Sequence, residues 1–176
     1  MHKTYLGRKY SVEEYDKEWQ RRFEEEAKIL KSILKSDALA VEHIGSTAVL
    51  GLIGKPTIDV LVVVSELSRA DSHTREIEAA GYKDLGEYIL PGTRLFVREK
   101  DNARLVNVHF FPQGHPHIEE KLLVRDYLRS HSEEVQKYGE LKHALSQRYP
   151  NDYGMYREEK DRYMKELLER AKSSAI

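Results

Sequence analysis

Residues 41–64 combine amino-acid types that could form a ligand site. A short apolar strand ends at Gly45 and Ser46, and a second strand carries one carboxylate, Asp59, in an aliphatic run. Gly45 has no Cβ, so a bound group could approach the backbone closely there. Ser46 and Thr47 add hydroxyls beside amides that could point at an anion if a helical turn begins at this point. This arrangement predicts a phosphate-binding loop.

Asp59 needs a partner in the folded chain. Thr57 to Val64 has the length and the β-branched residues of a strand that is buried on both faces. A carboxylate buried among such side chains is costly unless it is paired, hydrogen-bonded or bound to a metal. Lys55 is the nearest cation in the sequence, and Pro56 favours extended entry into the strand. We therefore expect Asp59 to belong to a site, close to Lys55.

Hydrophobic periodicity predicts the elements that position this loop. A capping-box pair, Ser11 and Glu14, and the spacing of apolar residues predict a helix from Val12 to about Lys35, with Trp19 in the core. Strands are expected at 38–44, 57–64, 82–88, 93–99 and 104–111, with a helix at 68–81 between the second and third.

After Pro112 the pattern becomes helical, with helices expected at 115–129, 130–149 and 153–172. The charged run 157–160 is expected to be a solvated helix face. These elements predict one α+β domain over residues 1–176. Its sheet core spans about 38–111 and is mixed and mainly antiparallel, and its C-terminal helices span about 115–172.

The composition and net charge of the chain exclude several classes of protein. The 176-residue chain has a formal net charge of -1, which gives no argument for nucleic acid or an anionic membrane as partner. It contains no cysteine, so disulfides and thiolate chemistry are excluded. No signal-peptide pattern or apolar stretch of membrane length occurs. We expect a cytoplasmic protein without a membrane partner, and nucleic acid is not an expected partner.

Four blocks of the sequence carry a resemblance to a known family. They are EHIGSTAV-x-GL-x-x-KP-x-IDVLV at 42–62, YDKEW at 15–19, VNVHFF at 106–111 and VRDYLR at 124–129. In this order they resemble the GrpB family, a bacterial group of the nucleotidyltransferase-like superfamily. The resemblance implies a nucleotidyltransferase-like fold that binds a nucleotide or another phosphorylated small molecule. Relatives fused to dephospho-coenzyme A kinase imply a functional link to that enzyme.

The sequence departs from the superfamily at the second carboxylate. Nucleotidyltransferases usually carry two acids at positions i and i+2 of one strand, where they hold divalent ions, but here Leu61 follows Asp59 at that spacing. The resemblance places His109 near Asp59. An Asp59 and His109 pair could act in acid–base catalysis, or could bind Mg²⁺, Mn²⁺ or Zn²⁺, with zinc or a transition metal fitting better than magnesium.

Basic residues of the C-terminal helices could close the site. Together with Lys55, Arg125 and Lys142 could contact phosphates. Arg125 could alternatively pair with Asp126 or other acids. Glu42 and His43 alternate along their strand, so only one of them faces a given side. The sequence leaves three functions open: a nucleotidyl or phosphoryl transferase, a non-catalytic ligand-binding or regulatory module that has lost the acid pair, and an interaction domain.

Overall fold

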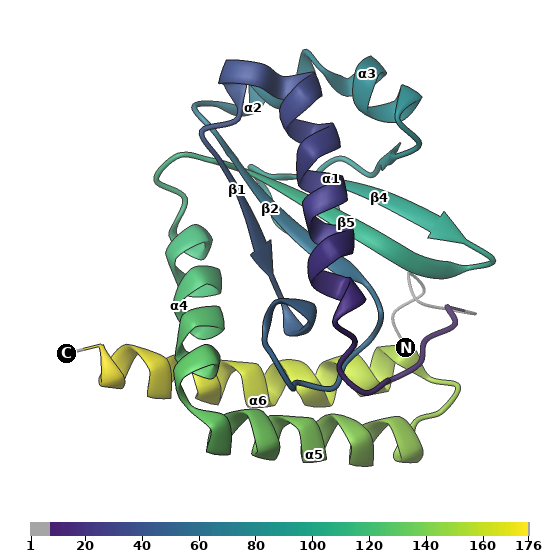
Figure 1. Cartoon of the computed structure of the whole chain (residues 1–176), viewed down its shortest axis with the longest axis vertical. Helices are drawn as coiled ribbons and strands as arrows, with labels where there is room; N and C mark the ends of the chain where they lie inside the picture. Colours follow the sequence, from purple (N-terminus) through teal and green to yellow (C-terminus); the bar gives the residue numbers. More distant parts are fainter. Residues whose placement is uncertain (1–7, 176) are drawn as a thin grey trace.

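A computed structural model describes residues 8–175, and a β-sheet lies at its centre (Figure 1). Within these residues the sheet has five strands in the order β1-β2-β5-β4-β3. The strands are β1 (Ala40–Ile44), β2 (Ile58–Val64), β3 (Lys83–Asp84), β4 (Arg94–Lys100) and β5 (Ala103–Pro112). Strands β2 and β5 pair in parallel, whereas the other pairings are antiparallel. The predicted α+β class with a mixed, mainly antiparallel sheet is confirmed.

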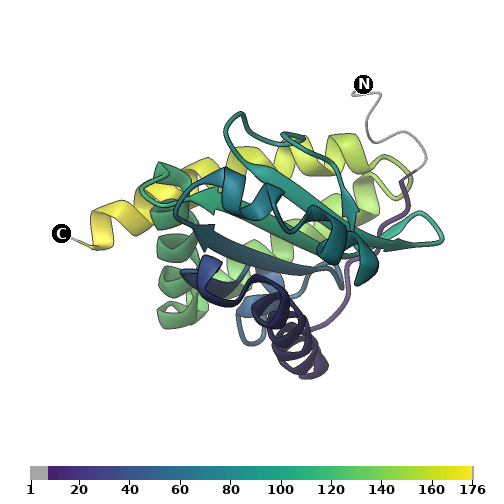
Figure 2. The same ribbon diagram turned by 90° about the horizontal axis from the view of Figure 1, so that it is seen from above.

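Helices cover both faces of this sheet. On one face, α1 (Glu18–Leu34), α2 (Leu67–Asp71) and α3 (Thr74–Ala79) share a core with β2 and β5. On the opposite face, α4 (Pro116–Ser130) packs against the sheet, and α5 (Ser132–Arg148) and α6 (Tyr153–Ser174) pack against α4. Figure 2 shows α1 and α6 on opposite sides of the sheet. None of the helices within residues 8–175 is long and apolar enough to cross a membrane.

Alternation along β2 and β5 decides which side chains face the C-terminal helices. Ile58, Val60, Val62 and Val64 of β2 point into the core beneath α1. Asp59 and Leu61 therefore point to the other face. The parallel register sets Asp59 beside Asn107 and Leu61 beside His109. One sheet face therefore presents Asp59, Asn107 and His109 together.

The first helix begins at Glu18 rather than at Val12. Glu13 pairs with Gly54 in an isolated antiparallel bridge, with N–H···O distances of 2.8 and 2.9 Å. The hydroxyl of Ser11 donates to the carboxylate of Glu13 at 2.7 Å. The predicted capping box at Ser11 is wrong, because the bridge keeps this part of the chain extended.

Two further elements differ from the prediction. The helix expected at 68–81 is two short helices, because the backbone leaves helical geometry at His73 (φ -103°, ψ 7°). The strand expected at 82–88 is only two residues long. Asp84 accepts a hydrogen bond from the amide of Gly86 at 2.7 Å, and this local turn ends the strand. The remaining predicted strands and helices are present, with ends shifted by a few residues.

Candidate functional site

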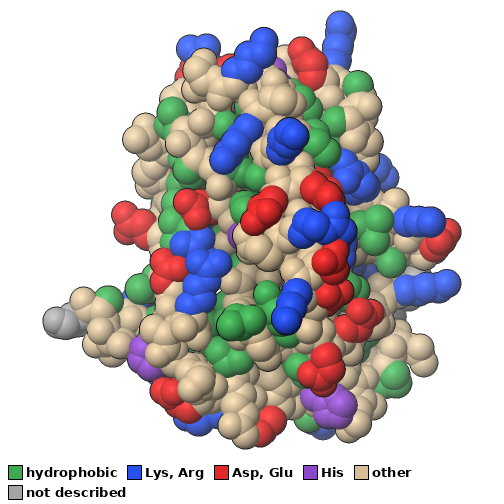
Figure 3. Space-filling model, viewed as in Figure 1, with side chains coloured by type: hydrophobic (Ala, Val, Ile, Leu, Met, Phe, Trp, Pro, Cys, Tyr) green, Lys and Arg blue, Asp and Glu red, His purple; other side chains and the backbone are tan. Residues whose placement is uncertain are grey.

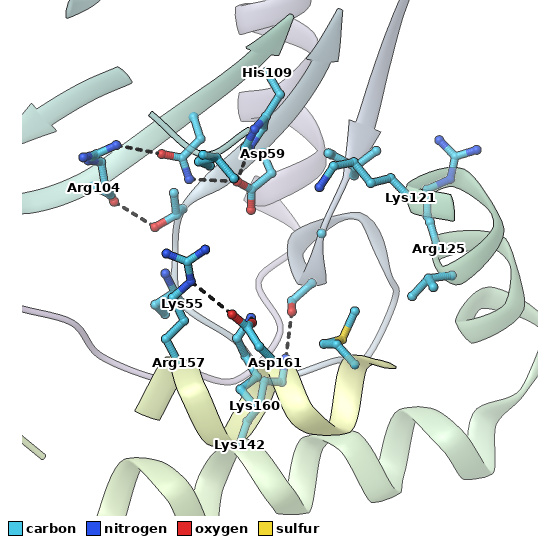
Figure 4. A pocket seen from close by; sticks show the side chains of 18 of the residues that line it. Lys55, Asp59, Arg104, His109, Lys121, Arg125, Lys142, Arg157, Lys160 and Asp161 are labelled. Carbon is cyan, nitrogen blue, oxygen red and sulfur yellow. Dashed lines mark hydrogen bonds and ion pairs between the residues drawn. The ribbon is translucent and has the colours of Figure 1, made fainter. Parts of the chain in front are cut away.

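A cavity of about 400 Å³ opens on the sheet face that carries Asp59, between β1, β2, β5 and the three C-terminal helices (Figure 4). Its lining has an excess of positive charge. Among residues 8–175, eight basic side chains line it, against the carboxylates of Asp59, Glu120 and Asp161. The basic residues are Arg8, Lys55, Arg104, Lys121, Arg125, Lys142, Arg157 and Lys160. Such a lining fits a ligand that carries several negative charges.

Asp59 lies on the wall of this cavity with its carboxylate held in place. Asn107 Nδ2 donates to Asp59 Oδ1 at 2.8 Å, and His109 Nε2 lies 3.4 Å from the same oxygen. Burial raises the pKa of Asp59, but His109, Asn107 and the charge of Lys55 together lower it to about 2. The side chain is 28% exposed, so the expectation of a carboxylate buried among aliphatic residues is wrong. Asp59 is an ionised group that faces the cavity.

His109 and Asn107 are oriented by their partners. Burial lowers the pKa of His109 more than the Asp59 carboxylate raises it, so the ring is neutral at neutral pH. Its Nε2 must then carry the ring proton, because an ionised carboxylate can only accept a hydrogen bond. Arg104 Nη1 donates to Asn107 Oδ1 at 3.2 Å, which fixes the amide with its nitrogen toward Asp59. A continuous chain of hydrogen bonds thus runs from Arg104 to the carboxylate.

The turn after β1 places backbone directly against Asp59. Gly45 has φ 74° and ψ -172°, and a Cβ built on it would lie 2.7 Å from Asp59 Oδ2. A short 3₁₀ turn begins at Ser46, as the predicted phosphate-binding loop requires. Gly45 therefore permits close approach to the protein's own carboxylate, in addition to any approach by a ligand.

Lys142 lies beneath this turn rather than projecting into solvent. Its Nζ donates to Ser46 Oγ at 2.8 Å and to the carbonyl of Ile53, and it lies 4.4 Å from the centroid of the Tyr138 ring. The residue is 1% exposed. Burial lowers its pKa well below the usual value, and the charges of Lys160 and Lys55 lower it further. Lys142 lines the cavity and holds the Ser46 hydroxyl in position.

Thr47 does not line the cavity. Its hydroxyl lies 2.9 Å from His43 Nε2, on the side of the sheet that α1 covers. His43 stacks on Phe23 with a centroid distance of 4.5 Å and an interplanar angle of 4°. Of the neighbouring pair at the end of β1, His43 belongs to the core, while Glu42 faces the C-terminal helices.

The two predicted cations outside α5 both contact protein groups. Lys55 Nζ donates to the Tyr153 hydroxyl at 2.7 Å, and burial followed by the charge of Arg8 lowers its pKa to about 7. Arg125 Nη1 donates to Glu42 at 2.7 Å, and Arg125 Nε donates to Asp126 at 2.7 Å. The alternative in which Arg125 pairs with acids is therefore present, although its side chain also lies on the cavity wall.

Sequence reasoning missed several basic residues of the cavity. Arg157 and Lys160 line it, so the expectation that run 157–160 is a solvated face is wrong for these two side chains. A charged run does not reveal which helix face another element covers. Lys121 precedes Arg125 by one helical turn, and this i, i+4 spacing was a usable signal that both share one face of α4. Arg104 and Arg8 carried no such signal.

The residues present do not fit a resident two-metal centre. Leu61 is completely buried in an apolar cluster with Ile44, Val63 and Phe111, so no second acid stands beside Asp59. Within residues 8–175, no group of three or more His, Cys, Asp or Glu side chains is placed to hold a metal ion. Asp59 and His109 provide two donors, and His109 Nε2 is directed at Asp59 itself.

A family profile and two sequence relatives each match most of this chain. The sequence profile of the family described as GrpB protein matches residues 9–170. The UPF0157 protein YqkA of Bacillus subtilis is 35% identical over 96% of this chain and 49% of YqkA. A dephospho-CoA kinase of Mycolicibacterium paratuberculosis is 27% identical over 89% of this chain and 44% of the kinase. The chain spans about half the length of these two relatives.

Two solved structures have a fold similar to that of this chain. The conserved protein GrpB from Enterococcus faecalis has a TM-score of 0.88 and 38% identity, covering 94% of this chain and 99% of that chain. Cid1 in complex with the UTP analog UMPNPP has a TM-score of 0.52 and 17% identity, covering 78% of this chain and 43% of that chain. The likeness to Cid1 concerns the fold alone, and it makes this fold nucleotidyltransferase-like.

Gly45→Ala should destabilise the protein more than Gly51→Ala. Both alanines must adopt a positive φ, of +74° and +77°, but only at Gly45 does the new methyl meet another residue, Asp59. Positive φ costs an alanine roughly 1–2 kcal/mol, and the clash should add about as much again. Urea denaturation measures both losses. Adding Asp59→Ala to Gly45→Ala should recover part of the excess, and equal losses in the two single variants would contradict the clash.

Protonation of His43 should destabilise the fold in acid. Burial lowers its pKa from 6.5 to about 4 against the opposing charge of Asp59, so the unfolded chain binds this proton first. The stability from neutral His43 is complete above the unfolded pKa and is lost as pH falls toward about 4. This loss should reach about 3 kcal/mol near pH 4. Urea denaturation of His43→Gln should show a correspondingly shallower pH dependence, and identical slopes would refute the assignment.

Proposed function

The chain belongs to the GrpB protein family, and on that basis we propose that it binds a nucleotide or another phosphorylated small molecule in the cavity above Asp59. Gly45 and Ser46 form the turn against which a phosphate rests. Lys55 and Lys121 neutralise its charge from the β1–β2 connection and from α4. The apolar part of the lining then contacts the remainder of the molecule.

The excess of basic over acidic side chains inside one cavity carries this proposal. Cations brought together in a partly enclosed space repel one another, and the pKa values of Lys55, Lys121 and Lys142 are all lowered, in each case first by burial. A polyanion removes both penalties because it supplies the missing counter-charge. On the face shown in Figure 3, acidic and basic side chains are interspersed, so that face does not continue the basic lining as a broad basic surface. This distribution favours a small ligand over a nucleic-acid duplex.

The comparisons suggest which ligands to test first. Cid1 binds a UTP analog on a similar fold, which supports nucleoside triphosphates as probes. The match to a dephospho-CoA kinase supports coenzyme A precursors as a second group, and a functional link to that kinase belongs to the proposal. Both groups share the phosphate ester chemistry that the cavity fits.

A transferase version of the function uses Asp59 and His109. An acceptor hydroxyl attacks the phosphorus atom, and the bond from phosphorus to the leaving phosphate breaks. Neutral His109 takes the hydroxyl proton at Nδ1, because Nε2 already carries the ring proton. Asp59 then stabilises the imidazolium, since it lies 3.4 Å from Nε2. Asp59 would also contact the divalent ion that the substrate brings bound to its phosphates.

The complete burial of Leu61 favours a second candidate function. A chain with a basic cavity and one carboxylate can bind a phosphorylated ligand without transferring any group. In that case it is a ligand-binding or regulatory module. The two candidates differ in their need for metal, and this difference can be measured.

Binding of ATP and diphosphate should depend on Lys121 and should take up a proton. Lys121→Ala should weaken binding about tenfold, the size of one charge-assisted contact, while Lys28→Ala on the far surface of α1 should leave it within about twofold.

Lys55 has a pKa of about 7, so near pH 8 it gains a proton when a phosphate binds. Calorimetry in two buffers of different ionisation enthalpy detects this uptake.

Lys55→Met should reduce the proton uptake, and affinity in the unaltered protein should fall as pH rises above about 7. Absence of binding to every nucleotide, diphosphate and coenzyme A precursor would refute the proposed function.

The response of Asp59→Asn to metal separates the two candidates. In a transferase that uses Mg²⁺, Mn²⁺ or Zn²⁺ with its nucleotide, the substitution should abolish metal-dependent binding. In a binding module, affinity should be indifferent to metal and should increase, because the substitution removes one negative charge from the cavity. Calorimetric titration of ATP with and without each metal, on both proteins, distinguishes these opposite signs.

A further inference from the structure

A second, smaller recess of about 270 Å³ adjoins the main cavity. Of the residues that the structure describes, four line both spaces: Arg8, Lys55, Thr57 and Arg104. Because three of these carry positive charge, the wall shared by the cavity and the recess is cationic. We call this shared wall the junction.

The recess has its own basic residue and no acidic one. Lys9, Ser11 and Ala103 line the recess but not the main cavity. Among the residues that the structure describes, no carboxylate lines the recess. Arg104 does pair with Glu99 at 2.5 Å, but the side chain of Glu99 is 39% exposed and lies outside the recess. An anion in the recess would therefore meet cations from several sides.

Residues 8–13, which we call the N-terminal arm, form one wall of the recess and are held by long-range contacts. Tyr10 donates its hydroxyl hydrogen bond to the carbonyl of Tyr149, and its ring lies 4.7 Å from the ring of Tyr156. The bridge between Glu13 and Gly54 fixes the next part of the arm. The recess is thus a built feature, with walls from the arm, the β1–β2 connection and β5.

The charges at the junction act on one another. Burial lowers the pKa of Arg8, and Arg104 lowers it further. Burial likewise lowers the pKa of Lys55, with Arg8 as the largest charge contribution and Arg104 adding to it. Arg8 and Lys55 are therefore less stable as cations because the other charges lie nearby, and a negative group placed at the junction relieves both.

We propose that the recess binds a second phosphate group, so that the natural ligand is a small molecule with phosphates at two separated positions. One phosphate lies in the main cavity above Asp59, and the other lies beyond the junction among Arg8, Lys9 and Arg104. This inference rests on the proposed function and adds the substrate class: a bisphosphorylated ligand is preferred over one whose phosphates form a single chain.

Three adenosine probes test the arrangement of phosphates. AMP carries one phosphate, ADP carries two in a chain, and adenosine 3′,5′-bisphosphate carries two at separate positions. By calorimetry at about 0.15 M salt, where exposed charges are largely screened, the bisphosphate should bind about tenfold more tightly than ADP. The gain reflects one additional charge-assisted contact.

Ala103→Glu places a carboxylate in the recess and should remove that gain, weakening the bisphosphate about tenfold while changing ADP affinity by less than about threefold. Ala103→Gln has nearly the same size without the charge and is the matched control, for which the preference should persist. Lys9→Ala should reduce the preference in the same direction without adding a group. Circular dichroism and the urea midpoint verify that each variant is folded.

The outcomes separate the two proposals. If ADP binds but the bisphosphate binds no more tightly, or if Ala103→Glu and Lys9→Ala weaken both ligands equally, the second phosphate site is refuted and the proposed function stands. If none of the probes binds, and no other phosphorylated ligand does, both are refuted. A preference for the bisphosphate that survives in Ala103→Gln and is lost in Ala103→Glu supports the inference.

Discussion

The ionised carboxylate of Asp59 is the constraint around which this end of the molecule is arranged. Parallel pairing of β2 with β5 brings Asn107 and His109 to it, and the glycine at position 45 leaves room for its second oxygen. Within the described part of the chain, Asp59, Glu120 and Asp161 supply three carboxylates, too few to balance the eight basic side chains that line the same cavity. The same arrangement that stabilises the carboxylate therefore leaves the surrounding cavity positive, and the cavity's preference for anions follows from the fold.

Much of this arrangement was accessible from the sequence. Length and β-branched composition located strand β2, and its isolated acid indicated a site, because strands of this kind rarely carry a charge without a partner. That Asn107 and His109 share a face followed from their spacing. Their distance to Asp59 required the strand order, which the family resemblance supplied and the parallel register of β2 and β5 establishes.

The remainder depended on long-range packing. A lysine on a helix is usually solvated, and nothing near Lys142 in the sequence indicates that the turn at Ser46 buries it. Thr47 follows Ser46 directly, yet the turn directs its hydroxyl to His43 on the other side of the sheet. Arg8 enters the cavity only because the N-terminal arm pairs with Gly54, a contact between residues far apart in the chain. Local patterns contain no information about such contacts.

The packing around Leu61 also limits how this protein can evolve. Its side chain fills an apolar cluster that Ile118 and Leu122 of α4 cover. A single mutation of Leu61 to aspartate would place a charge in that cluster and would lose the burial of the leucine side chain. The mutant protein would be unstable and would be removed by selection. A lineage with this core could acquire a two-acid centre only after α4 had changed. A single substitution at position 61 is therefore not enough to give this protein a stable pair of catalytic acids.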